Sequence, residues 1–305
     1  MLAALVTTLL FATSAVCGYR TAKQIGGLEA NFWRITLATV FLTIWAYTYG
    51  AGFAGAPEWF LLSGLFGIGI GDSAYFQALP RLGSRRTVLI TQCLTAPCAA
   101  LIEWLWLGTR LHWPEIFCVA VILAGVAVAL APGDHLKISA RDWKIGLTAS
   151  ALAALGGALG AVIIRKGYAA IQATGGNVDA GTTGYQRVLG GILIPAVALF
   201  IYKWRSLPAP SGWQEGKTLQ FTRDKWMRLW PWVLANALAG QTLGVTCMQW
   251  ALKTTQAGIV TAIIATTPLV LLPMTRLVEG EKIGFRSLAG ALIAVGGVMG
   301  LTFFR

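Results

Sequence analysis

Asp72 is the residue of this chain best placed to do chemistry inside an apolar environment. It lies in the run GLFGIGIGDSAYFQAL and is the only carboxylate far from both ends of an apolar run. An ionisable group at such a depth is costly to bury and therefore predicts a functional site. On a helix Asp72 shares a face with Tyr75. The chemistry would be contact with a substrate ammonium group or carriage of a proton. The alternative is a structural hydrogen bond at a glycine-rich helix crossing.

An enzymatic interpretation of the same residues can be tested on the sequence. Gly69-Ile70-Gly71-Asp72 matches the GxGD signature of intramembrane aspartyl proteases. Their reaction needs two carboxylates that share a proton at close range. The other aspartates all lie in polar connectors: Asp134, Asp142, Asp179 and Asp224. We therefore expect no catalytic residue and no enzymatic activity.

Two arginines open apolar runs at equivalent places, Arg34 within NFWR and Arg187 within GYQR. Such a pair could bind a carboxylate or neutralise Asp72. The alternative is that each side chain extends to the membrane interface.

Uncharged polar residues complete the candidate lining of a cavity. Amides at helix depth offer both donors and acceptors, and they are Gln77, Gln92, Asn236, Gln241 and Gln249. They could equally link helices to one another. Pro97 and Pro268 each lack an N–H and could bend a helix around a cavity, or only set a packing angle.

The elements that must position these residues are membrane helices. The chain of 305 residues is 56% hydrophobic and 12% charged, whereas soluble domains carry about a quarter charged residues. Its apolar residues fall in runs of roughly 18–22, long enough to cross a bilayer. Ten runs can be placed: 1–19, 31–49, 59–79, 87–107, 114–131, 145–164, 183–202, 229–250, 257–278 and 285–304.

The first run has no preceding basic residue and fits a span better than a cleavable signal peptide. The net charge of +12 comes from Lys and Arg in short connectors, which anchor and orient spans and do not predict nucleic-acid binding. The five cysteines lie in apolar runs without metal-ligand spacing, so we expect no metal site.

An internal repeat organises the runs. Thr91 to Leu130 resembles Ile263 to Thr302, about 172 residues later, and in this register Gln77 falls on Gln249. A fixed offset inside apolar sequence indicates a duplicated transporter half. We expect residues 1–131 and 145–305 to form two five-helix repeats, with a hinge at 132–144 and a polar loop inserted at 203–228. Because five spans per half is an odd number, the halves should be inverted in the membrane.

Small residues spaced four apart predict close helix packing within this architecture. Gly156 and Gly160 form such a pair in the sixth run, as do Ala120 and Ala124 in the fifth and Gly296 and Gly300 in the tenth. The fifth and tenth runs are the least polar, and we interpret them as scaffold.

The repeated block resembles the EamA-type repeat of the drug/metabolite transporter superfamily. It contains a proline-bearing helix, a Gly-Glu-Arg-Leu-like turn and a helix ending in Ala/Gly-Gly-Val. Here these are Pro97, Gly108-Thr109-Arg110-Leu111 and Ala124-Gly125-Val126, then Pro268, Gly280-Glu281-Lys282-Ile283 and Gly296-Gly297-Val298. Thr109 stands where the family usually has Glu. The family places both termini in the cytoplasm, whereas the basic connectors would place them outside.

The resemblance implies an all-α integral membrane protein of the inner membrane that works as a secondary transporter without cofactor. Its substrate would be a small polar or amphipathic metabolite such as an amino acid or amine, more readily exported than imported. No Walker-type loop is present, so transport would be proton-coupled or a facilitated uniport. The alternatives are a nucleotide-sugar or phosphorylated-metabolite exchanger and a non-transporting membrane scaffold. The sequence leaves a monomer and a homodimer equally open.

Overall fold

The computed structural model describes residues 1–108, 112–130, 139–205, 223–279 and 285–303, which are helical almost throughout and contain no strand. Helices occupy all ten apolar runs. The elements, in chain order, are α1 (Leu2–Ile25), α2 (Gly27–Thr48), α3 (Pro57–Gly64), η1 (Leu65–Asp72), α4 (Ser73–Leu82), α5 (Ser84–Leu107), α6 (Trp113–Leu130), α7 (Ala140–Ala173), α8 (Ala180–Arg205), α9 (Arg223–Asn236), η2 (Ala237–Gly244), α10 (Val245–Thr254), α11 (Ala257–Ile264), α12 (Thr267–Glu279) and α13 (Phe285–Phe303).

Several predicted connectors fall wholly or partly outside the described residues. These include the turns at 109–111 and 280–284, most of the 132–144 hinge and the centre of the 203–228 loop. The ends of that loop are helical, since α8 continues to Arg205 and α9 begins at Arg223. The predicted loop is therefore shorter than the sequence indicated.

Two π-helical segments, η1 and η2, interrupt otherwise continuous α-helix. η1 joins α3 to α4, and η2 joins α9 to α10. Both contain eight residues and begin 172 positions apart, which is the spacing of the sequence repeat. π-helical turns are rare and often mark functional sites. Here Asp72 is the last residue of η1, and the equivalent last residue of η2 is Gly244.

The two prolines that could bend a helix or set a packing angle, Pro97 and Pro268, lie in different settings. Pro97 lies inside the continuous helix α5 and is exposed. Pro268 is buried in the first turn of α12, just after α11 ends at Ile264. α5 thus continues through Pro97, whereas Pro268 marks the start of a new helix.

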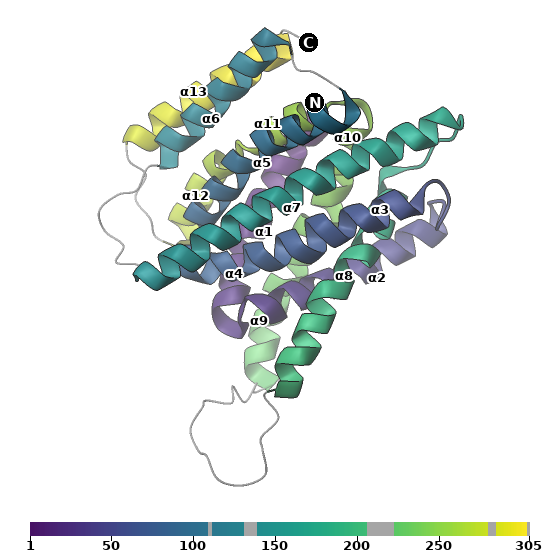
Figure 1. The fold of residues 1–305 in the computed structure, drawn as a ribbon. Coiled ribbons are helices and arrows are strands. Elements are labelled where there is room, and N and C mark those ends of the chain that lie inside the picture. Colours follow the sequence, from purple (N-terminus) through teal and green to yellow (C-terminus); the bar gives the residue numbers. More distant parts are fainter. Residues whose placement is uncertain (109–111, 131–138, 206–222, 280–284, 304–305) are drawn as a thin grey trace.

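The central helices pack in an antiparallel manner around η1. Trp45 near the end of α2 donates from Nε1 to Asp179 Oδ1 before α8 (3.1 Å), and Lys203 Nζ near the end of α8 lies 3.4 Å from Glu29 Oε1 near the start of α2. The long helix α7 lies across the middle of the molecule and packs on α5, α4 and η1 (Figure 1). η1 is thus held between α7 and α8.

Glycines allow this close packing. A Cβ atom on Gly156 of α7 would lie 2.7 Å from the Phe66 carbonyl oxygen of η1, and one on Gly160 would lie 3.1 Å from Gly67 Cα. The predicted pair of small residues in α7 therefore does face a neighbouring helix at short range.

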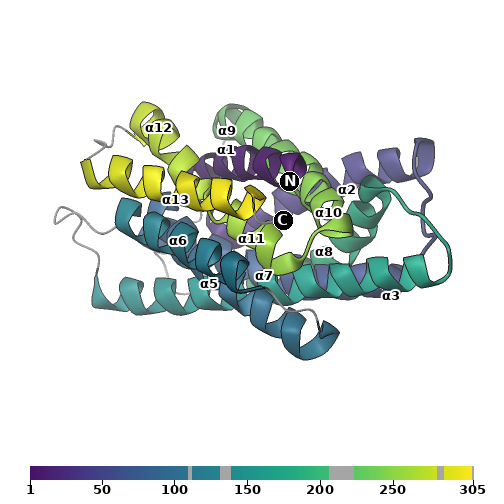
Figure 2. The same cartoon turned by 90° about the horizontal axis from the view of Figure 1, so that it is seen from above.

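α6 and α13 form a separate antiparallel pair beside the other helices (Figures 1 and 2). Their contact uses Gly125, whose Cβ would lie 2.5 Å from the Ala294 nitrogen, and Gly297, whose Cβ would lie 2.7 Å from Ile122. The predicted pairs hold only in part for these helices. Ala120 and Ala124 are exposed, and Gly296 has open space around it, but a Cβ on Gly300 would lie 3.0 Å from Cys118 Sγ of α6. With small residues at adjacent positions, spacing alone does not show which of them faces the partner.

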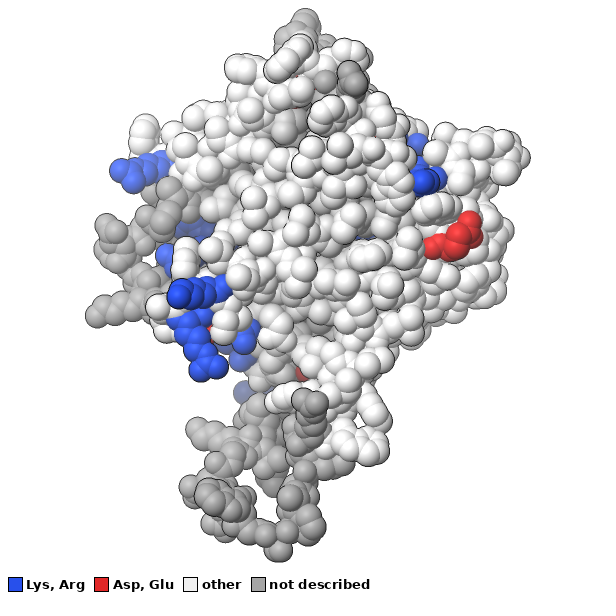
Figure 3. Space-filling view, in the orientation of Figure 1, with Lys and Arg blue, Asp and Glu red and all other residues white. Residues whose placement is uncertain are grey.

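Within the described residues, six helical segments are long and apolar enough to cross a membrane: Leu2–Ile25, Pro57–Leu82, Ser84–Leu107, Ala140–Ala173, Ala180–Trp204 and Ala257–Leu277. α6 and α13 contain shorter apolar stretches. Charged side chains gather toward opposite ends of the molecule and leave a broad uncharged middle (Figure 3). Most of the basic ones visible lie at the end where α7 begins. This distribution suits a protein embedded in a bilayer, which has water only at its two faces.

Candidate functional site: a cavity lined by both halves

Asp72 lies in a network of hydrogen bonds contributed by three elements. Arg34 of α2 donates from Nη2 to Asp72 Oδ2 at 2.9 Å and to Asn31 Oδ1 at 2.8 Å. Gln241 of η2 donates from Nε2 to the same Asp72 oxygen. The Arg34 guanidinium carbon also lies 4.6 Å from the centre of the Phe76 ring. A carboxylate from the first half is thereby bound by an amide from the second.

Arg187 lies on α8, where its side chain is 4% exposed. Its Nε and Nη1 atoms are buried and make no hydrogen bond. Gly67 of η1 and Gly160 of α7 leave room for its guanidinium, because a Cβ on these glycines would lie 2.6 and 3.3 Å from Nη2. The structure thus contains a buried cation without a bound counterion.

These groups line one cavity of about 140 Å³. Its walls come from α1, α2, η1, α4 and α5 and from α7, α8, η2, α10, α11 and α12. The polar side chains that line it are Ser14, Arg34, Asp72, Tyr75, Thr91, Gln92, Thr95, Arg187, Gln241, Thr261 and Thr267. Among the described residues, none of α6 or α13 belongs to the lining.

Comparison of the sequence with models of protein families identifies the kind of protein that contains this cavity. The model for the EamA-like transporter family matches residues 1–131 and 144–303. The chain belongs to the EamA-like transporter family. It is accordingly a multi-pass membrane transporter of the drug/metabolite transporter superfamily.

Other comparisons add the fold alone. A solved structure titled "Crystal structure of protein" is 16% identical, has a TM-score of 0.70, and is matched over 99% of this chain and 96% of its own. No curated protein matches this EamA-like transporter.

The structure brings six of the residues predicted for the site of this EamA-like transporter to the cavity. They are Arg34, Asp72, Tyr75, Gln92, Arg187 and Gln241. Their grouping follows from the close packing of η1 against α7 and α8, and from the contacts of η2 with α1 and α2.

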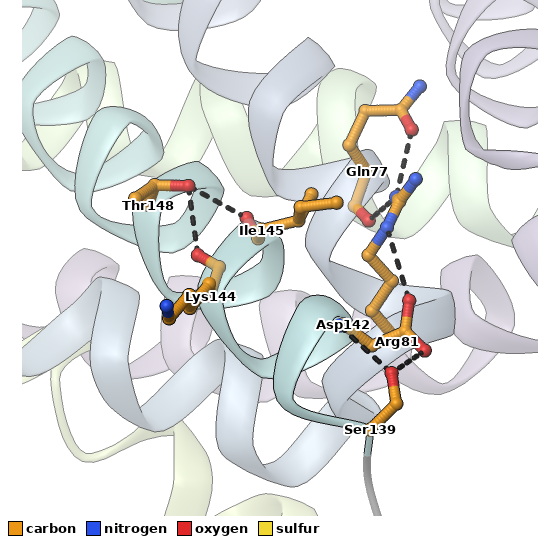
Figure 4. A network of polar contacts seen from close by, with 7 residues as sticks. All are labelled: Gln77, Arg81, Ser139, Asp142, Lys144, Ile145 and Thr148. Atoms are coloured by element: carbon orange, nitrogen blue, oxygen red, sulfur yellow. Dashed lines mark hydrogen bonds and ion pairs between the residues drawn. The ribbon is translucent and has the colours of Figure 1, made fainter.

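Gln77 lies away from the cavity, contrary to the prediction. Its side-chain oxygen and its backbone carbonyl both accept from Arg81 Nη1, the former at 3.0 Å. Arg81 Nε is 3.9 Å from Asp142 at the start of α7, and Figure 4 shows Arg81 between the two residues. Its i, i+4 spacing to a basic residue explains this role, because such pairs face each other on a helix.

The remaining predicted residues also lie outside the cavity lining. Gln249 and Asn236 are fully buried, and Asn236 Oδ1 accepts from Ser14 Oγ at 2.7 Å, so this amide joins α9 to α1. Pro97 faces outward and Pro268 is buried beyond the lining. The equivalence of Gln77 and Gln249 in the repeat therefore does not extend to a shared place in the cavity.

Sequence reasoning missed a second buried ion pair. Glu103 of α5 is 2% exposed, and its Oε1 accepts from Arg165 Nε of α7 at 3.0 Å. Its Oε2 accepts from the first N–H groups of α11, those of Ala257 at 2.7 Å and Gly258 at 3.3 Å. Glu103 lies only four residues before the end of its apolar run, a position from which a side chain can also reach the membrane interface. Its burial depends on α7 and α11, which the local sequence does not reveal.

Among the described residues, the cavity lining contains one carboxylate, Asp72, whereas the protease chemistry considered above needs two. No cluster of three His, Cys, Asp or Glu side chains suited to a metal occurs among the described residues.

Proposed function

We propose that this EamA-like transporter is a secondary transporter of the inner membrane that exports a small polar metabolite by alternating access. Ten transmembrane helices would form two inverted halves, residues 1–131 and 145–305. The halves would rock around the cavity and expose it to either side of the membrane in turn. The observation that carries the proposal is that both halves contribute polar side chains to one cavity.

The helix boundaries support two equivalent halves. η1 and α4 recur as η2 and α10 at a spacing of 172 residues, and α6 recurs as α13. α2 and α8, the second helices of the two halves, run antiparallel. These relations fit repeats inverted about an axis in the membrane plane. Superposition of the halves about an axis normal to the membrane would contradict this proposal.

Alternating access can be tested by cysteine labelling. The five native cysteines would first be replaced, and a single cysteine placed at Gly157, whose Cβ would have no neighbour closer than 3.7 Å. A membrane-impermeant thiol reagent should label Gly157→Cys from both sides of sealed liposomes. Gly296→Cys is the matched control, because it is also a glycine with room for a side chain but lies on α13, outside the cavity lining. Labelling of Gly157→Cys from neither side would support the scaffold alternative.

Transport itself can be tested by counterflow in liposomes with amino acids, organic acids and amines, at two pH gradients. Uptake that follows the pH gradient would indicate proton coupling, and equal uptake in both gradients would indicate uniport. Asp72 is the residue we assign to coupling, because it is the one carboxylate among the described residues that line the cavity. Asp72→Asn should then lose gradient-driven uptake but retain counterflow.

The geometry gives less support to an exchanger of nucleotide sugars or phosphorylated metabolites. Such a substrate would need several cations in the cavity. Two other arginines of the helices do not supply them, because Arg165 is paired with Glu103 and Arg276 is exposed outside the lining. Arg34 and Arg187 are left, and Arg34 is already paired with Asp72.

A further inference from the structure

We propose that Arg187 binds a carboxylate group of the transported metabolite, an inference that rests on the transport function proposed above. It narrows the substrate to carboxylate-bearing molecules and excludes simple amines. The argument comes from a difference between the two halves at otherwise equivalent positions.

Arg34 and Arg187 occupy corresponding places. Each is the eighth residue of its helix, α2 or α8. Each guanidinium also lies against a glycine of the π-helical segment in the opposite half. A Cβ on Gly240 of η2 would lie 3.2 Å from Arg34 Nη1, and one on Gly67 of η1 would lie 2.6 Å from Arg187 Nη2.

The counterions of these two arginines differ. Arg34 pairs with Asp72, the last residue of η1. The last residue of η2 is Gly244, which has no side chain to offer Arg187. Among the lining residues the charged groups are therefore two guanidinium groups and one carboxylate.

An unpaired cation in such a place is costly, because its lost hydration is not replaced. Two of the three guanidinium nitrogens of Arg187, Nε and Nη1, have no partner in the structure. A guanidinium presents a planar fork that matches a carboxylate in two parallel hydrogen bonds. A carboxylate supplied by the substrate would fill the position that Asp72 fills for Arg34.

The same residues disfavour other ligands. A simple amine would leave Arg187 unpaired and add a further positive charge to the cavity. A phosphate dianion would bring two negative charges close to Asp72, whose side chain is 26% exposed. A monocarboxylate would neutralise the site, and an amino acid could also place its ammonium group near Asp72.

The test compares probes with matched carbon skeletons: leucine, 4-methylpentanoate and 3-methylbutylamine, then phenylalanine, 3-phenylpropanoate and 2-phenylethylamine, with inorganic phosphate as a further arm. Purified protein is titrated with each probe while its melting temperature is measured. At least one carboxylate probe should raise the melting temperature, and the amines and phosphate should not. Leucine or phenylalanine acting alone would indicate a zwitterion, and the acids acting alone would indicate a monoanion.

Three variants connect the response to the residue. Arg187→Gln should weaken carboxylate binding at least 100-fold, and Arg187→Lys should retain part of it. Arg276→Gln, an exposed arginine outside the lining, is the matched control and should bind as the unmodified protein does. Without ligand, Arg187→Gln should melt no lower than the unmodified protein, because it removes an unpaired buried charge.

The assignment is overturned if no carboxylate raises the melting temperature, if amines or phosphate do so equally, or if Arg187→Gln binds carboxylates normally. These outcomes are separable from failure of the transport function. Labelling of Gly157→Cys from both sides would show a moving cavity whatever its ligand.

Discussion

Arg34 and Asp72 form an ion pair in which Nη2 lies 2.9 Å from Oδ2, although they come from different helices and are 38 positions apart in sequence. The Arg34 side chain is 5% exposed and that of Asp72 is 26% exposed, so the arginine is the buried partner. Removing one partner of such a pair leaves an uncompensated charge, which costs more than removing both. The pair therefore makes a specific prediction about stability.

Asp72→Asn should lower the free energy of unfolding by about 3–5 kcal/mol, because Arg34 then loses its counterion. The double variant Arg34→Gln with Asp72→Asn should be more stable than Asp72→Asn alone. Melting temperatures of the single and double variants in one detergent measure this coupling. Additive effects would show that the two residues do not depend on each other.

Glu103 should hold α5, α7 and α11 together at one end of the molecule. Glu103→Gln removes the negative charge that faces Arg165. Its amide NH2 group would also lie against the N–H donors of Arg165 or of α11, where it cannot accept a hydrogen bond. We therefore expect the free energy of unfolding to fall by about 1–3 kcal/mol. Thermal unfolding measures it. Adding Arg165→Gln should restore part of the loss, and a wild-type melting temperature for Glu103→Gln would contradict this role.

Asp179, in the connector before α8, gives a prediction about pH. Burial raises the pKa of its carboxyl, but hydrogen bonds from the Thr182 side chain and backbone, Trp45 and the Gly181 backbone outweigh this and lower the pKa below its usual value. A lowered pKa in the folded state means that stability is gained above the unfolded-state pKa of about 4, and is lost as pH falls through the folded-state value.

Unfolding of the protein between about pH 5 and pH 2 should therefore become less dependent on pH in Asp179→Asn. Asparagine can still cap α8, where Asp179 Oδ1 now accepts from the Thr182 N–H at 2.9 Å. Asp179→Ala should cost about 1 kcal/mol at neutral pH, because the cap is lost. Equal pH slopes for Asp179→Asn and the unmodified protein would contradict the assignment.

Gly64→Ala should destabilise the contact between α3 and α8. Its Cβ would lie 1.8 Å from the Arg187 carbonyl oxygen, and a backbone atom cannot move aside as a side-chain end can. We expect a loss of about 1–3 kcal/mol from overpacking. Gly296→Ala is the matched control, since its Cβ would meet nothing within 4 Å, and it should be neutral or slightly stabilising. Equal melting temperatures for the two variants would contradict the packing seen here.

Hydropathy and charge predict much of this molecule because they report on burial in lipid. The apolar runs became helices, and the arginines and the carboxylate at helix depth, Arg34, Arg187 and Asp72, meet in one cavity. Gln77 failed as a prediction because depth alone does not give the direction of a side chain, and Arg81 binds it one turn away.

Other features depend on tertiary contacts that local sequence does not encode. The capping of α11 by Glu103 requires a helix 154 positions further along the chain. The apolar residues of η1 and η2 follow no pattern that distinguishes a π-helix from an α-helix, so neither segment was predicted. Between neighbouring small residues such as Gly296 and Gly297, only the position of α6 decides which one makes the contact.

The π-helical segment that ends at Asp72 lets the helix from α3 to α4 hold an additional residue. An α-helix closes each hydrogen bond over four residues and a π-helix over five. Adding or deleting a residue in regular α-helix turns every later residue by about 100°. The wider turn of η1 absorbs its additional residue, so deleting Ile70 should let η1 close as ordinary α-helix while α4 keeps its direction. A deletion of one residue inside α4 should instead turn the rest of that helix away from its present neighbours.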